Sequence, residues 1–136
     1  MDKDRVKKQA EYWFLTAEHD HDTMLGLFKL SRYSDALFYG HIVLEKILKA
    51  LAVINNSDYA PLVHDLNVLA RLSGEQFSNQ EAYLLKNINT FNIRARYPDD
   101  KLNFYKKCDY QYARYYLHKI SNLYKKLCHS LKQKTL

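Results

Sequence analysis

The sequence has few of the residues that interrupt or cross-link a chain. Its 136 residues include three glycines, two prolines and two cysteines. A fold of many short strands is therefore disfavoured, because tight turns draw on glycine and proline. No apolar run approaches the roughly 18 residues of a membrane-spanning helix, so we expect no such span. What remains is a chain suited to helices.

Cysteine chemistry is also disfavoured. Cys108 and Cys128 fall on one expected helix, where a rise of about 1.5 Å per residue separates them by about 30 Å, too far for a disulfide. No C-x-x-C pair is present to suggest a zinc site.

The first nine residues are charged, without the apolar segment of a secretion signal. We expect a cytoplasmic protein with no metal and no other cofactor.

The charge and length of the chain set broad limits on its function. Lysine and arginine number 21 against 15 acidic residues, which gives a formal net charge of +6 at pH 7. Such a charge helps to attract a polyanion without identifying it. A chain of 136 residues suits one hydrophobic core. We therefore predict a single domain over residues 1–136.

The apolar residues recur every three or four positions, which is typical of helices that bury one face. Gly40 lies in the apolar stripe of the second expected helix, where it would let a neighbouring helix approach closely. The intervening stretch Asp99 to Lys107 is polar and is interpreted as a connection. The prediction is an all-α, up-and-down bundle of four long helices plus one short helix, over about 4–30, 35–54, 65–72, 78–97 and 109–132.

Several residues define the expected helix ends. Asp2 or Asp4 would cap the first helix, and the stretch Ser31 to Ser34 would break the chain and cap the second. Gly74 suits the end of the short helix. The fourth begins with an S-x-x-E capping box at residues 78–81 and ends before a proline, near residue 97.

The stretch Arg94 to Asp100, RARYPDD, is the most informative for function. An arginine guanidinium presents a planar fork of donors that suits phosphate, and Tyr97 is able to stack on a base. The alternative is that Arg94 and Arg96 pair with carboxylates at the end of the bundle, and residue chemistry alone favours it.

Other polar residues carry weaker signals. His41, Glu45 and Lys49 lie one turn apart on one helix face, although such a Glu and Lys also form ordinary surface pairs. His64 precedes Asp65 at the start of the short helix, where either residue would serve as a cap.

Asp20 interrupts the apolar stripe of the first helix and needs a partner, such as Arg94 or Arg96. The nearby run Glu18 to Asp22 is rich in possible metal ligands, yet only its two ends share a helix face, so metal binding is disfavoured. Five of the twelve tyrosines lie in the last helix and make it aromatic, which suits RNA stacking, core packing or a dimer face.

Taken in order along the chain, these residues resemble the HEPN family. The ordered combination is more specific than any one motif, and E-K-x-x-K and A-R-Y-P contribute most. The matching segments are Trp13-x3-Ala17-x2-Asp20, Ala36-Leu37-Phe38, Leu44-Glu45-Lys46-Ile47-Leu48-Lys49-Ala50, His64-Asp65-Leu66 and Ala95-Arg96-Tyr97-Pro98-Asp99.

The resemblance implies a helical bundle that is often dimeric, with motifs of its second and fourth helices meeting at a cleft. It also implies a minimal nucleotidyltransferase partner, as in toxin and antitoxin pairs, and a nucleotide or RNA ligand. Asp20 would orient an arginine from behind. The nucleotide- or RNA-binding residues carried over are Glu45, Lys49, His64, Arg94, Arg96 and Tyr97.

One departure from the family bears on catalysis. In HEPN ribonucleases four to six residues separate an arginine from a following histidine, and neither Arg94 nor Arg96 has a histidine at that spacing. The leading hypothesis is therefore a binding and interaction module without catalytic residues. The alternatives are a metal-independent RNase toxin with a degenerate site that uses His64 as base, or a purely structural helical subunit. The positions without histidine are Asp99, Asp100, Lys101, Leu102 and Asn103.

Overall fold

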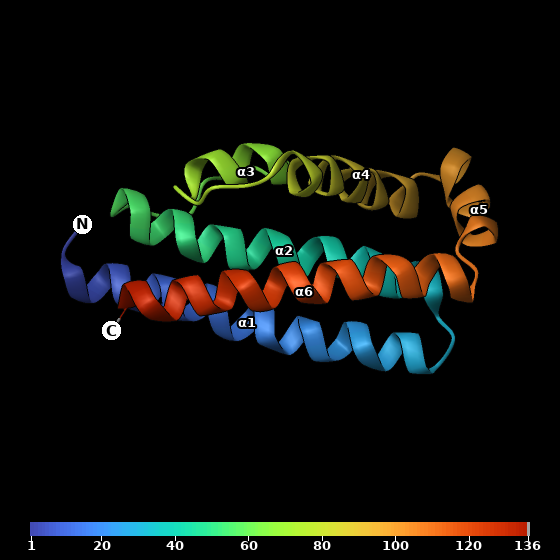
Figure 1. Ribbon diagram of the computed structural model, residues 1–136, viewed down its shortest axis with the longest axis horizontal. Coiled ribbons are helices and arrows are strands. Elements are labelled where there is room, and N and C mark those ends of the chain that lie inside the picture. The colour runs from blue at the N-terminus through green and yellow to red at the C-terminus, as the bar shows by residue number, and fades with distance from the viewer. Residues whose placement is uncertain (136) are drawn as a thin grey trace.

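A computed structural model describes residues 1–135 and shows a bundle of helices (Figure 1). The prediction of an all-α fold is confirmed, and within the described residues there is no strand. The single domain over residues 1–136 stays a prediction. The helices are α1 (Lys3–Lys29), α2 (Tyr33–Asn56), α3 (Leu66–Leu72), α4 (Asn79–Arg96), α5 (Pro98–Lys107) and α6 (Tyr110–Thr135).

The helix count differs from the prediction at one place. The sequence predicts a polar connection over Asp99 to Lys107, but the structure has the ten-residue α5 there. Pro98 is the first residue of this helix, where a backbone N–H would have no helical partner, so proline is tolerated there. Phe104 is the buried residue of the helix. Two acidic residues in its first turn and two lysines in its last turn favour it electrostatically. The bundle therefore has four long helices and two short ones in residues 1–135.

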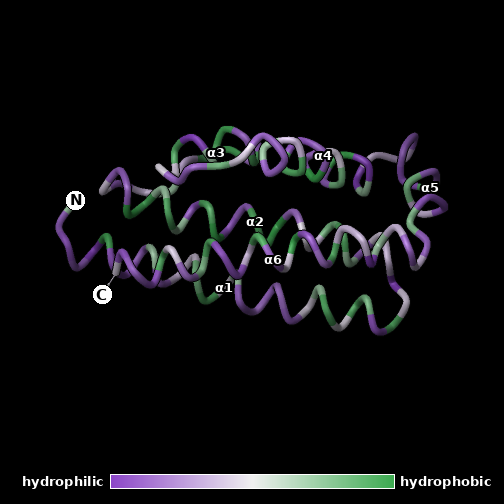
Figure 2. The backbone as a smooth tube through the Cα atoms, viewed as in Figure 1, coloured by the Kyte–Doolittle hydropathy of each residue, from purple (hydrophilic) through white to green (hydrophobic). Residues whose placement is uncertain are grey.

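α2 is the centre of the bundle. More than half of its 24 residues are buried, and α1, α3, α4 and α6 all pack against it. Figure 1 shows α1 and α6 beside α2, α3 and α4 above it, and α5 across the end of the bundle away from the termini. Figure 2 shows hydrophobic and hydrophilic residues alternating along the helices, as expected if each buries one face.

Local sequence explains most helix ends. Asp2 caps α1 by accepting a hydrogen bond from the Arg5 amide, and Ser78 and Glu81 form the capping box at α4. Gly74 follows α3 with a φ of +74°, which suits glycine. The break between α1 and α2 is where it was expected, but Arg32 occupies the cap position without a side-chain hydrogen bond. The cap residue therefore lies within the expected stretch Ser31 to Ser34, but no side chain caps α2.

Gly40 lies where α6 approaches α2. A Cβ atom at this position would come 2.6 Å from the Ile120 Cδ1 atom. Glycine therefore permits the close contact between the two helices, as its place in the apolar stripe predicted. This contact fixes α6 against the same helix that carries His41, Glu45 and Lys49.

Candidate functional site

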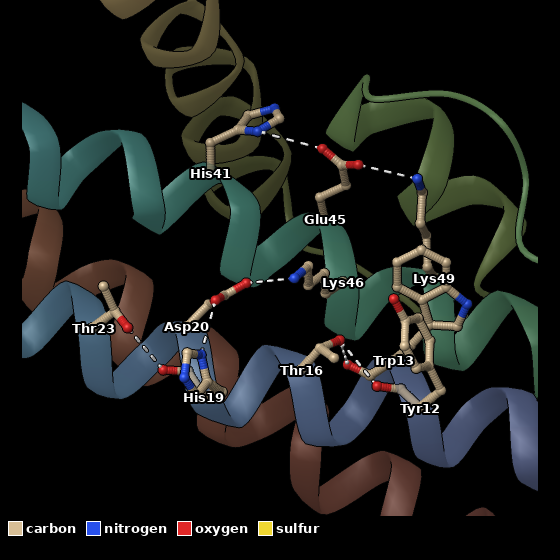
Figure 3. Close-up of polar contacts among 10 residues, drawn as sticks. All are labelled: Tyr12, Trp13, Thr16, His19, Asp20, Thr23, His41, Glu45, Lys46 and Lys49. Carbon is tan, nitrogen blue, oxygen red and sulfur yellow. Dashed lines mark hydrogen bonds and ion pairs between the residues drawn. The ribbon is translucent and has the colours of Figure 1, made fainter.

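A row of polar side chains crosses the otherwise apolar α2. His41, Glu45 and Lys49 follow one another at intervals of one turn (Figure 3). His41 is 1% exposed and Lys49 is 5% exposed, so neither is a surface residue. A lysine at this depth is stable only with a nearby counterion, and Glu45 provides one.

The Glu45 carboxylate is shared among three basic side chains. Its Oε2 atom lies 3.0 Å from Lys49 Nζ and 2.8 Å from His64 Nδ1. Its Oε1 atom lies 3.6 Å from His41 Nδ1, which is too long for a hydrogen bond. Glu45 therefore joins α2 to the loop that precedes α3.

His41 is held in its neutral form by its surroundings. Burial lowers the pKa of His41 below its ordinary value of 6.5, although the nearby Glu45 carboxylate opposes the shift. The Nδ1 atom is buried without a hydrogen-bond partner. With His41 neutral, Lys49 is the buried positive charge that balances Glu45.

His64 reaches Glu45 because the next residues anchor its loop. Asp65 caps α3, as expected, by accepting from the Asn67 amide at 2.9 Å. The Asn89 side chain of α4 donates to Asp65 at 3.1 Å and accepts from the Leu66 amide at 2.8 Å. The His64 side chain remains 71% exposed, so this end of the row is open to solvent.

Lys49 also contacts the first helix. Its Nζ atom lies 5.1 Å from the centroid of the Trp13 ring, a cation–π contact visible in Figure 3. The Trp13 Nε1 atom is buried and has no hydrogen-bond partner. Trp13, the first residue of the family resemblance, thus supports the lysine of the E-K-x-x-K motif.

Asp20 does not orient an arginine, so that expectation is wrong. Its Oδ2 atom lies 2.5 Å from Lys46 Nζ (Figure 3). Lys46 is the neighbour of Glu45 in sequence, but it points from α2 towards α1, whereas Glu45 faces the loop before α3. Asp20 is therefore part of the packing of α1 on α2 and lies apart from the Glu45 row.

The two arginines of α4 lie on aromatic rings. The Arg94 guanidinium carbon is 4.9 Å from the Phe104 ring centroid, and that of Arg96 is 5.3 Å from the Phe38 ring centroid. Among residues 1–135, neither arginine forms an ion pair with a carboxylate. The alternative of carboxylate pairs at the bundle end is therefore wrong, and Arg96 and the adjacent Tyr97 are both exposed.

The structure brings together part of the expected site. Glu45 contacts both Lys49 and His64, and Arg96 lies on Phe38, which precedes His41 by one turn on the same helix. Arg94 faces α5, Tyr97 is exposed and Asp20 is elsewhere. We name the row from Arg96 and Phe38 through His41 and Glu45 to Lys49 and His64 the Glu45 cluster.

The sequence alone does not identify two members of this cluster, His41 and Phe38, or the residue Asn89 that anchors it. His41 is placed on the right helix face but is not among the expected site residues, although its spacing from Glu45 points to it. Phe38 lies in a quoted motif with no role assigned. Asn89, which anchors the His64 loop, has no signal in a single sequence because its partners are 22 to 24 positions away.

Two further observations concern the chain as a whole. Over residues 1–135, no group of three histidine, cysteine or acidic side chains is placed to hold a metal ion. Within the run from Glu18 to Asp22, the His19 ring contacts Asp20. The His21 ring is hydrogen-bonded to Ser121 and stacks on Tyr124. No helix in the described part of the chain combines the length and apolar character needed to cross a membrane.

Comparison with protein families matches residues 10–130 to the HEPN domain. The chain belongs to the HEPN domain family. The match includes every residue of the Glu45 cluster, and it confirms the resemblance that the ordered motifs indicated. Membership places this HEPN domain among nucleotide- or RNA-related modules.

The fold is also similar to a solved structure. The crystal structure of TT1696 from Thermus thermophilus aligns with a TM-score of 0.74 and 20% sequence identity. The alignment covers 93% of this chain and 98% of the other, so the likeness extends over the whole HEPN bundle. No curated protein matches the sequence.

The positions at which HEPN ribonucleases carry a histidine lie in α5. The residues at these positions are exposed and none of them is histidine. No imidazole of α5 therefore approaches Arg96. The imidazoles close to Glu45 come instead from α2 and the loop before α3. This HEPN domain therefore arranges its histidines differently from the ribonuclease motif. The five positions are Asp99, Asp100, Lys101, Leu102 and Asn103.

Proposed function

We propose that this HEPN domain is a nucleotide- or RNA-binding and interaction module that acts with a nucleotidyltransferase partner in the cytoplasm, in a toxin–antitoxin type of pair. The observation that carries the proposal is Arg96. Its guanidinium is exposed, lies on the Phe38 ring and forms no ion pair among residues 1–135. A guanidinium held on a ring keeps its donor fork oriented for a phosphate.

The surroundings of Arg96 suit such a ligand. Tyr97 is 58% exposed beside it and presents an aromatic face to a base. His64 is the other exposed member of the Glu45 cluster and supplies a further polar group. The buried Lys49 and Glu45 neutralise one another, so their role is to fix the position of His64.

Replacing Arg96 by alanine is expected to weaken binding of a short single-stranded RNA by about tenfold, because one phosphate contact is lost. Fluorescence anisotropy with a labelled oligonucleotide at fixed salt measures the change. Arg5→Ala, at an exposed arginine of α1, is the matched control and should bind like the unmodified protein. Titrations in which the unmodified protein binds neither RNA nor nucleotide would rule the proposal out.

The partner and the dimer need separate tests. A nucleotidyltransferase encoded beside this gene should co-purify with the HEPN domain, and light scattering of the isolated domain should give the mass of a homodimer. A monomer without a neighbouring nucleotidyltransferase would instead favour a purely structural helical subunit of another assembly.

A second candidate function is RNA cleavage, and the His64–Glu45 contact favours it. The carboxylate holds Nδ1 of His64 and leaves Nε2 of the exposed ring for a substrate, as in general bases oriented by an acid. In this reaction Nε2 takes the proton of a ribose 2′-hydroxyl, the 2′-oxygen attacks phosphorus, and the 5′-oxygen leaves with a proton from water. Arg96 would stabilise the charge that develops on the phosphate.

His64→Ala should abolish this cleavage, with a loss of about a hundredfold or more, because no other exposed imidazole contacts Glu45 in the described residues. The assay is cleavage of single-stranded and structured RNA by purified protein, with His118→Ala on the exposed side of α6 as the control. Intact RNA after incubation with the unmodified protein excludes the nuclease and leaves the binding module.

A further inference from the structure

A groove runs between α4 and α6, away from the Glu45 cluster. Both helices pack against α2, and side chains such as Phe91 and Tyr116 connect them, but their backbones stay apart and leave a space of about 520 Å³ between them. Figure 1 shows α4 and α6 as separate rods, with α4 above α6 in this view. The volume is in the usual range of small-ligand sites, about 300–1,000 Å³. We call this space the α4–α6 groove; its lining includes Tyr83, Asn87, Tyr115, Tyr116, Lys119 and Lys126.

Three tyrosines give the groove aromatic walls. Tyr83 of α4 is 66% exposed and Tyr115 of α6 is 56% exposed, so both rings have faces available to a ligand. Tyr116 meets the edge of Tyr115 at a centroid distance of 5.1 Å. Burial, together with the Tyr115 and Tyr83 phenols, raises the pKa of Tyr116, so its hydroxyl stays protonated and uncharged.

The polar side chains of the groove favour an anion. Lys119 Nζ lies 5.2 Å from the Tyr115 ring centroid, and it forms no ion pair in residues 1–135. Lys126 lies 2.8 Å from Glu81, which is the one acidic side chain among those that line the groove. Glu81 is also bound to the Ser78 backbone in the capping box. The groove therefore carries a net positive charge.

The composition distinguishes two kinds of occupant. Protein interfaces are rich in tyrosine but depleted in lysine, whereas sites for single-stranded nucleic acid combine exposed aromatic rings with a positively charged groove. Here two lysines and the amide of Asn87 accompany the tyrosines. The ligand chemistry that fits is a planar aromatic group carrying negative charge, which is that of a base with its phosphate.

We propose that the α4–α6 groove is a second nucleotide-binding site, in which a base stacks on Tyr115 or Tyr83 and Lys119 and Lys126 hold its phosphate. The proposal rests on the proposed function for its ligand class only. Its residues are separate from Arg96 and from every other member of the Glu45 cluster. The two sites are therefore testable independently.

The test is fluorescence anisotropy of a labelled eight-nucleotide uridine RNA, with unlabelled uridine monophosphate as competitor. Tyr115→Ala and Lys119→Ala should each weaken binding by about tenfold, as expected for one stacked base or one phosphate contact. Tyr115→Phe should bind normally because it keeps the ring. Tyr12→Ala, at a tyrosine of α1 that is also 56% exposed, controls for general loss of aromatic surface.

The outcomes separate this site from the Arg96 site. If the groove variants bind RNA more weakly, the groove is supported as a binding site, whether or not Arg96→Ala also binds weakly. Competition by uridine monophosphate would show that a free nucleotide is enough to occupy a site. Loss confined to Arg96→Ala overturns the groove and keeps the proposed function, and an absence of binding by the unmodified protein overturns both. Groove variants that bind RNA normally but no longer form a dimer assign the groove to self-association and overturn the proposal.

Discussion

Replacing Glu45 by glutamine is expected to lower the free energy of unfolding by about 3 kcal/mol, since it leaves a buried ammonium without a counterion. Lys49 is 5% exposed, and its Nζ atom has Glu45 as its ion-pair partner at 3.0 Å. Glutamine keeps the shape of the side chain, so the loss reports charge and not packing. Urea unfolding at pH 7, followed by circular dichroism, measures the change.

A double variant makes this result specific. Lys49→Met removes the buried charge while keeping a long apolar side chain against Trp13. In the Glu45→Gln background it should restore most of the lost stability, because the uncompensated ammonium is gone. A loss below about 1 kcal/mol in the single variant would mean that Lys49 finds water or another partner and would contradict the account of a paired, buried lysine.

Replacing Phe104 by alanine is expected to lower the free energy of unfolding by about 3 kcal/mol, the usual range for a large buried aromatic side chain. Phe104 is fully buried, packs on Phe91 at a centroid distance of 5.4 Å and carries the Arg94 guanidinium on its ring. Urea unfolding followed by circular dichroism again measures the change. A weaker helical signal before unfolding would indicate that α5 has detached.

Leu102→Ala is the matched control on the same helix. Leu102 is 60% exposed, so its truncation should change stability by less than about 0.5 kcal/mol. Equal losses at Phe104 and Leu102 would contradict the view that α5 is held to the bundle by one buried ring. A loss at Phe104 alone would confirm it.

The comparison between sequence and structure shows what periodicity is able to predict. The four long helices follow from apolar spacing, and the capping box at Ser78 fixes the start of α4 to the residue. α5 escapes prediction because a short helix that buries only Phe104 has almost no apolar period. Pro98 correctly indicates the end of α4, but a proline also suits the first position of a new helix.

Helical spacing predicts the Glu45 cluster only where its residues share a helix, whereas His64 and Arg96 are expected through the family resemblance. The spacing of His41, Glu45 and Lys49 places them on one face without any knowledge of the fold. The contact between His64 and Glu45 spans 19 positions and depends on how Asp65 and its neighbours fold the loop. The predicted partner of Asp20 is wrong for a similar reason, because the partner is set by which face of α2 meets α1.

The central place of α2 has a consequence for the way the domain opens. Because α1, α3, α4 and α6 bury their apolar faces chiefly on α2, no smaller group of helices keeps a core once α2 is lost. Backbone amides of α2 should then exchange with deuterium only through global unfolding. α5 contacts mainly the end of α4 and is anchored by one ring, so its amides exchange through a local opening. Such openings should release α5, and with it the Phe104 ring that lies beside Arg94, while the cooperative core remains folded.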